Sequence, residues 1–132
     1  MDFVQLIPLP VLDESTAGNS ETVSVGVPAG GAASYEIVGA EFSPDTSRTA
    51  NDTNYAILKL YADSTEVASI DTRTAASGGT GNLTAHTPVG FSIASKAVKL
   101  TAGTSAIKAT KTVAGSGLAL TGCVTLFIRP IR

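Results

Sequence analysis

Apolar and polar residues alternate along most of the chain, in short stretches that begin at residue 22. In TVSVGV (residues 22–27) the valines occupy every second position, and seven later stretches repeat this period of two. A period of two sends successive side chains to opposite faces of a β-strand, whereas an amphipathic helix needs a period of about 3.6. The pattern therefore predicts eight strands, at residues 22–27, 33–42, 54–62, 65–71, 88–94, 96–102, 105–113 and 122–131.

Turn-forming residues separate these stretches at intervals of about 8–12 residues, the spacing of all-β sandwiches and barrels. Asp63-Ser64 stands between two of the stretches and indicates a tight hairpin. No segment combines a sustained helical period with helix caps. We predict one all-β domain over residues 21–132, folded as an antiparallel β-sandwich or a jelly-roll-like domain.

The stretch NYAILKLYA (residues 54–62) has two different faces. One face carries alanine and leucine and is typical of a core face. The other carries two tyrosines, an isoleucine and a lysine, and amphipathic aromatic residues are enriched at protein–protein interfaces. We predict a subunit interface on this second face; the alternatives are a second core layer or a surface covered by the N-terminal segment. The predicted interface residues are Tyr55, Ile57 and Tyr61.

The first twenty residues lack the alternation. The apolar run from Phe3 to Leu12 contains Pro8 and Pro10, which disfavour a helix and favour extended backbone. We predict an extended N-terminal arm over residues 1–20, which either lies on its own domain or reaches onto a neighbouring subunit. The residues predicted to anchor this arm to a partner are Phe3, Leu6, Ile7, Leu9 and Val11.

A glycine cluster lies in SIDTRTAASGGTGNLTAHTP (residues 69–88). A phosphate-binding P-loop needs a lysine after its glycines and a helix after the loop, and this stretch has neither. The stretch does not match the Asp-Thr-Gly motif of aspartic proteases either, because Arg73 occupies the position of the glycine. We predict a long contact loop instead, with positive φ at its glycines. Its predicted residues are Asp71 and Arg73 as anchors, with Gly78, Gly79 and Gly81 as bends.

The composition narrows the function classes. Alanine, glycine, serine and threonine supply nearly half of the 132 residues, charged residues make up 15%, and the net charge is −2. Basic residues are scattered rather than gathered into a stripe, so we expect no nucleic-acid partner. No apolar run reaches the length of a membrane span, so we expect no membrane partner either.

Candidate chemistry is sparse. The chain has one histidine, His86, and one cysteine, Cys123, which we predict to be a buried thiol in the last strand. Asp45, Asn51 and Asp52 share one loop, but their spacing matches no calcium-binding pattern. These residues supply no paired acid and base and no metal-ligand set. We therefore expect a protein that is not an enzyme and that uses no cofactor or metal.

Three segments resemble the small decoration (cement) proteins of tailed-bacteriophage heads. They are FVQLIPLPVL (residues 3–12), YAILKLYADSTEVASIDTRT with GGTGNLT (residues 55–74 and 78–84), and CVTLFIRPI (residues 123–131). The resemblance rests on pattern and composition and carries no diagnostic motif. It implies a structural virion protein, often a homotrimer, that binds the major capsid protein at the capsid surface and stabilises the head. The N-terminus lacks the features of a signal peptide, so we expect synthesis in the host cytoplasm.

An alternative function is a receptor- or carbohydrate-binding β-sandwich domain of a phage fibre or tail. Sugar sites commonly use exposed aromatic side chains, and this chain has no tryptophan and three tyrosines. Under this alternative, Tyr55 and Tyr61 would contact the glycan. A secreted adhesive subunit is a further alternative, and the absent signal-peptide features argue against it.

Overall fold

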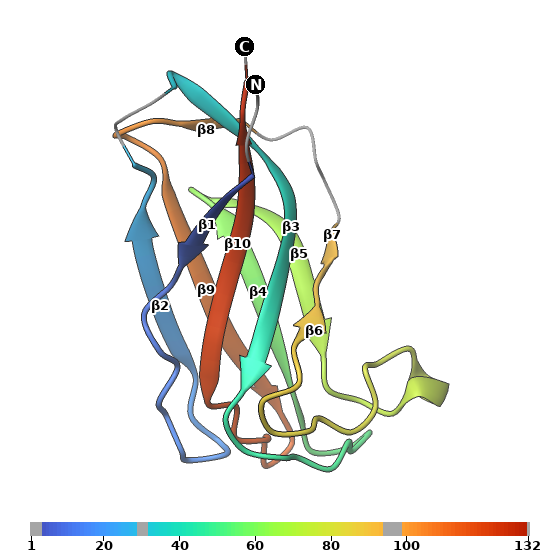
Figure 1. The fold of residues 1–132 in the computed structure, drawn as a ribbon. Helices are drawn as coiled ribbons and strands as arrows, with labels where there is room; N and C mark the ends of the chain where they lie inside the picture. The colour runs from blue at the N-terminus through green and yellow to red at the C-terminus, as the bar shows by residue number, and fades with distance from the viewer. Residues whose placement is uncertain (1–3, 29–31, 94–98, 132) are drawn as a thin grey trace.

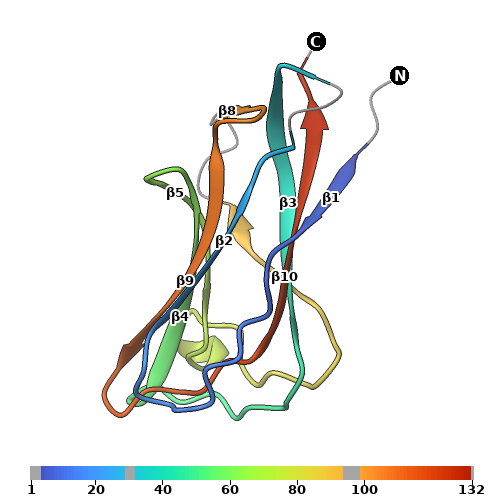
Figure 2. The same cartoon turned by 90° about the vertical axis from the view of Figure 1, so that its left-hand side faces the viewer.

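The computed structural model describes residues 4–28, 32–93 and 99–131. They form ten strands and one short 3-10 helix, so the all-β prediction is confirmed (Figure 1). Two antiparallel sheets face one another as a sandwich (Figure 2).

Sheet A has the order β1-β10-β3-β6, and β8 also pairs with β3. Its strands are β1 Gln5–Pro8, β3 Ser34–Pro44, β6 Val89–Gly90, β8 Lys99–Thr101 and β10 Gly122–Pro130. Sheet B has the order β2-β9-β4-β5-β7; its strands are β2 Glu21–Gly26, β4 Tyr55–Ala62, β5 Thr65–Asp71, β7 Ser92–Ile93 and β9 Ala106–Ala114.

The strand pairs are nested along the chain. The β4–β5 hairpin lies at the centre, and each earlier strand pairs with a later one: β3 with β6, β2 with β9, and β1 with β10. Successive pairs alternate between the two sheets, as if a two-stranded ribbon had been rolled up. This is the topology of a jelly roll, one of the two arrangements that the alternation predicted. It also places the start of β1 beside the end of β10, at the same end of the sandwich (Figure 1).

The core lies between the sheets and is built by alternate residues of each strand. In β4 the predicted core face is confirmed, because Ala56, Leu58, Leu60 and Ala62 are all buried. The largest fully buried apolar side chains are Tyr35, Phe42, Leu12, Ile37, Leu58, Leu60, Leu100, Ile107, Leu120, Leu126 and Ile128. No helix in the described parts of the chain is long and apolar enough to cross a membrane.

One stretch that was predicted as a single strand crosses between the sheets. The predicted strand 88–94 divides into β6, which pairs with β3 in sheet A, and β7, which pairs with β5 in sheet B. Between them the buried Phe91 donates its backbone N–H to the carbonyl oxygen of Ala40, 2.9 Å away. Among the described strands, the crossing leaves the end of β5 paired with β4 on one side and without a strand on the other.

The N-terminal segment is part of the sandwich, so a separate arm is not confirmed. Strand β1 pairs with β10 as the edge of sheet A, and backbone hydrogen bonds extend this pairing from Leu9 to Val124 and from Leu12 to Gly122. Of the two predicted placements, the structure has the one on its own domain. The prolines fit because the free side of an edge strand needs no N–H donor.

Candidate functional site

The loop between β5 and β6 is folded back onto its own beginning. It contains the 3-10 helix η1 (Ala75–Ser77), and its next residues return to the start of the loop. The N–H of Gly79 donates to the carbonyl of Thr74 at 3.0 Å, that of Thr80 to Asp71 at 2.8 Å, and that of Gly81 to Arg73 at 3.1 Å. These bonds hold residues 78–81 beside the end of β5.

The predicted anchors Asp71 and Arg73 pair with each other. Arg73 Nη2 and Nε lie 2.6 and 2.9 Å from Asp71 Oδ2, while Nε and the backbone N–H of Arg73 lie 3.1 and 2.9 Å from Oδ1. These hydrogen bonds lower the pKa of the Asp71 carboxyl below its usual value. The guanidinium also stacks over the Tyr55 ring, 5.1 Å from its centroid, as a cation–π contact.

The glycines of this loop have two different roles. Positive φ is confirmed at Gly78 (86°) and Gly81 (76°), where other residues would be strained. At Gly79 the prediction of positive φ is wrong. A Cβ there would lie 2.1 Å from the carbonyl oxygen of Arg73, so this position needs glycine for close approach of two backbone segments.

A second loop, residues 45–54, is hydrogen-bonded to the loop between β5 and β6. The Asp52 carboxylate accepts hydrogen bonds from the N–H and hydroxyl of Thr74, each at 2.9 Å, and these bonds lower its pKa. Arg48 and Leu83 exchange backbone hydrogen bonds of 2.9 and 2.8 Å. Residues 45–54 and 72–88 therefore form one joined surface, and within the described residues no cluster of three or more metal-ligating side chains is present.

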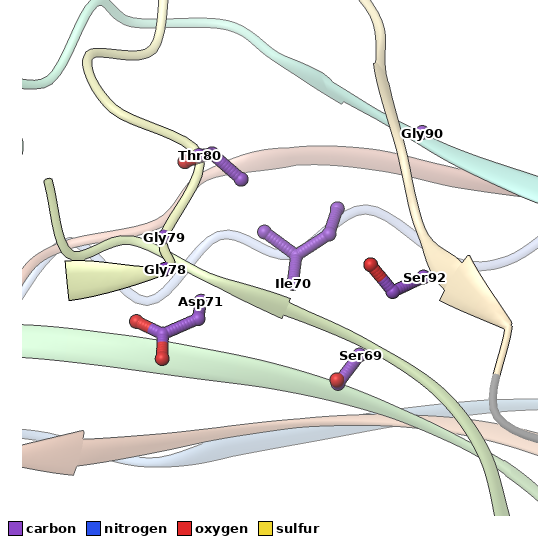
Figure 3. Close-up of a pocket in the computed structure, with 8 residues that line it drawn as sticks. All are labelled: Ser69, Ile70, Asp71, Gly78, Gly79, Thr80, Gly90 and Ser92. Carbon is purple, nitrogen blue, oxygen red and sulfur yellow. The ribbon is translucent and has the colours of Figure 1, made fainter. Parts of the chain in front are cut away.

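A polar cleft of about 410 Å³ lies where this loop meets the sheet crossing (Figure 3). Three segments form its walls: the end of β5, residues 78–80, and the crossing from β6 to β7. In Figure 3 Ile70 lies between Thr80 and Ser92, and Ser69 and Asp71 lie on either side of Ile70 along β5. The lining residues are Ser69, Ile70, Asp71, Gly78, Gly79, Thr80, Gly90 and Ser92.

The predicted interface residues lie on the outer face of sheet B. Tyr55, Ile57 and Tyr61 alternate with the buried residues of β4 and are each half-buried. The N-terminal segment does not cover them, because β1 belongs to the other sheet. Arg73 covers one side of the Tyr55 ring, whereas Tyr61 lines a shallow hollow of about 350 Å³ with Lys108.

The predicted anchors of the N-terminal segment divide into two groups. Ile7 and Leu9 are buried in the core of their own domain, so they are not available to a partner. Leu6 and Val11 are 62% and 53% exposed, and Val4 beside them is 53% exposed. Phe3 lies outside the described residues.

Exposed Val4, Leu6 and Val11 form what we call the N-terminal stripe. They are the large apolar side chains that are exposed within the described residues. In the register of the sheet Leu6 is opposite Phe127 of β10, which is half-buried on the same outer face. The stripe thus continues from the edge of sheet A onto its face.

Lys111 is a buried cation that the sequence analysis missed. Its side chain is 0% exposed, and its Nζ lies 3.4 Å from the carbonyl oxygens of both Thr16 and Ala17. Burial lowers its pKa below 10.5, although Glu14 and Glu21 act in the opposite direction. The ammonium group therefore contacts the backbone of residues 16 and 17, in the segment that precedes β2.

His86 and Cys123 occupy separate surfaces. The His86 side chain is exposed in the loop, and the backbone N–H of His86 donates to the carbonyl oxygen of Pro44 at 2.7 Å. The prediction of a buried thiol is wrong: Cys123 is half-buried, because it shares the outer face of β10 while Val124 faces the core. No hydrogen bond joins these two side chains in the described part of the chain, so their geometry forms no nucleophile–base pair there.

No protein-family model matches the sequence, and no curated protein sequence matches it significantly.

Proposed function

We propose that the protein is a non-enzymatic structural virion protein, a capsid decoration (cement) protein that binds the outer surface of a phage head and stabilises it. Its proposed partner is the major capsid protein, and its proposed location is the capsid surface. The observation that carries this proposal is the N-terminal stripe. Exposed apolar side chains gathered on one edge favour a docking surface over a surface that stays in water.

The fold supports the same proposal by analogy. Jelly rolls are common among viral capsid and lectin domains, although a fold alone does not determine a function. The resemblance of three segments to cement proteins points in the same direction as the stripe. In a capsid lattice a modest apolar contact repeats many times, so several subunits acting together bind strongly.

Binding to capsids tests the proposal directly. The triple variant V4S/L6S/V11S should lose affinity for phage heads stripped of this protein by at least about a hundredfold, since each change removes buried apolar area. The matched control V4I/L6M/V11I keeps the stripe apolar and should bind as the wild type does. The measurement is co-sedimentation with heads, together with the temperature at which the heads burst. Equal binding by the serine variant would overturn the proposed surface.

The proposed homotrimer is tested separately, because it uses the outer face of sheet B. Light scattering at micromolar concentration should show a trimer for the wild type and a monomer for Ile57→Asp. Thr101→Asp changes an exposed residue of β8 in the other sheet and should leave the trimer intact. A wild-type protein that is a stable monomer would contradict this part of the proposal.

A further inference from the structure

The cleft at the end of β5 is separate from the N-terminal stripe, so the proposed capsid docking does not involve it. The stripe lies along β1 at the edge of sheet A, whereas the cleft opens between β5 and the crossing from β6 to β7. Its volume of about 410 Å³ lies within the range of about 300–1,000 Å³ that is typical of small-molecule sites.

The walls of the cleft are held in place without a ligand. Backbone bonds fix residues 79–81 to Asp71, Arg73 and Thr74, and the bond from Phe91 to Ala40 fixes the crossing. The Asp71–Arg73 pair braces the base of the loop at the other side. A site that is already ordered loses little conformational entropy when it binds.

The charge of the lining excludes several ligand classes. Asp71 is the charged residue of the lining, and Arg73 occupies both of its carboxylate oxygens. A phosphate or carboxylate ligand would meet this acidic group and no lining cation. A metal ion would find a single carboxylate, and an apolar ligand would find one apolar residue, Ile70, which is 2% exposed.

The remaining groups of the lining are neutral and hydrogen-bonding. Ser69 and Ser92 stand directly opposite each other in the pairing of β5 with β7, and neither hydroxyl makes a hydrogen bond within the described residues. The Thr80 hydroxyl donates to the carbonyl of Gly81 at 3.0 Å, which leaves its oxygen able to accept. Hydroxyls that both donate and accept suit a ligand that carries several hydroxyls of its own.

We propose that this cleft binds a neutral sugar unit of a glycan, held by hydroxyl and backbone groups of β5, β7 and residues 78–80. The sugar would offer hydroxyl groups to Ser69, Ser92 and Thr80. Two glycines allow a close approach, because the side-chain positions of Gly78 and Gly90 face open space. This site differs from the tyrosine site considered above, since Arg73 already covers one side of the Tyr55 ring.

The test is a titration of the whole protein, labelled with ¹⁵N, with the methyl glycosides of glucose, galactose, mannose and N-acetylglucosamine. At least one neutral glycoside should cause saturable shifts of the backbone amides of residues 69, 78–80 and 92. Sialic acid is the charged comparison and should cause none. No saturable shift with any neutral glycoside, or shifts with sialic acid alone, would overturn the proposal.

Two matched variants locate the binding. Ser92→Leu fills the cleft from β7, and Ser24→Leu makes the same change at an exposed serine of β2, the other edge strand of sheet B. Ser92→Leu should weaken sugar binding at least about tenfold, and Ser24→Leu should leave it unchanged. Equal effects of the two variants would place any binding elsewhere and overturn the assignment.

Sugar binding and capsid docking can fail independently. The variant V4S/L6S/V11S should still bind the sugar, and Ser92→Leu should still sediment with phage heads. Loss of both activities in Ser92→Leu, with an unchanged free energy of unfolding, would show that one surface serves both and would contradict the separate cleft.

Discussion

Two irregular segments of the molecule each include or contact a cation, and the two cations differ in burial and in their partners. Residues 72–81 contain Arg73, whose side chain is 35% exposed and makes a close pair with the Asp71 carboxylate. Residues 13–20 are held by Lys111, whose side chain is 0% exposed and meets only backbone carbonyls at 3.4 Å among the described residues. A part-buried pair near the surface adds modest stability, whereas a buried cation without a carboxylate carries a desolvation cost.

Each segment also makes a close backbone approach to a glycine, which is Gly79 within residues 72–81 and the distant Gly117 for residues 13–20. A Cβ at Gly79 would lie 2.1 Å from the carbonyl oxygen of Arg73, and a Cβ at Gly117 would lie 2.1 Å from that of Ala17. Close backbone packing is therefore common to both segments, and the cations are what distinguishes them. The comparison indicates that packing holds both segments, while charge determines how each responds to pH.

The largest expected effect is on packing. Gly117→Ala should lower the free energy of unfolding by about 3 kcal/mol, because it adds a clash to a position whose φ is 77°. Gly79→Ala, without positive φ, should cost about 2 kcal/mol. Denaturant unfolding measures both. Gly90→Ala is the control, since no atom lies within 4 Å of its Cβ, and it should stay within about 0.5 kcal/mol of the wild type.

The next effect separates the two cations. Lys111→Met keeps the length of the side chain and removes the buried charge, so it should raise the free energy of unfolding at neutral pH by about 1 kcal/mol. The carbonyls that it frees belong to Thr16, which is exposed, and Ala17, which is half-buried. If Lys111→Met instead lowered the free energy of unfolding by more than about 1 kcal/mol, the ammonium group would stabilise residues 13–20, contrary to this expectation.

The pH dependence should differ between the segments on the alkaline side. Because burial lowers the pKa of Lys111 in the folded state, the unfolded chain binds more protons between that folded pKa and 10.5. Stability should therefore rise with pH in this window for the wild type, and the rise should disappear in Lys111→Met. Unfolding curves at a series of pH values, with Arg73→Gln as the comparison, measure the difference.

On the acidic side stability should also rise with pH, but the source is the other segment. The pKa of Asp71 is lowered from 3.8 in the folded state, so its contribution is complete above 3.8 and is lost as pH falls through the folded value. Asp71→Asn should flatten this acid loss, and Lys111→Met should leave it unchanged. If the free energy of unfolding fell equally at low pH in the wild type and in Asp71→Asn, the acid loss of stability would come from other carboxylates, such as Asp45 and Asp52.

The smallest expected effect concerns the geometry of the exposed pair. Arg73→Lys keeps the charge but loses the two-pronged contact with Asp71 and the stacking on Tyr55. It should lower the free energy of unfolding by about 0.5 kcal/mol. A loss above about 2 kcal/mol would show that Arg73, rather than backbone packing, holds residues 72–81.

The alternation of the sequence was sufficient to predict the sandwich, but it missed β1 and the sheet crossing. Pro8 and Pro10 indicated an arm, although an edge strand tolerates prolines because one of its sides has no partner. The stretch 88–94 alternates like one strand, and only the position of two different neighbours, β3 and β5, divides it at Phe91.

Within the candidate sites, local features were predictable and long-range ones were not. The Asp71–Arg73 pair and the bends at Gly78 and Gly81 follow from the sequence alone. Lys111 could have been found, since it alternates with Ile107 and Ala109 on the inward face of β9. The cleft could not, because it depends on three segments that meet only in the folded chain.

The nested strand order also determines when the chain can fold during synthesis. Of the strand pairs in the described residues, only β4–β5 joins consecutive strands, and β10 lies between β1 and β3 in sheet A. We expect sheet A to close only after residues 122–130 have left the ribosome, and to close slowly, as proteins dominated by distant contacts do. Until then β1 has no partner strand, and unpaired strand edges favour aggregation.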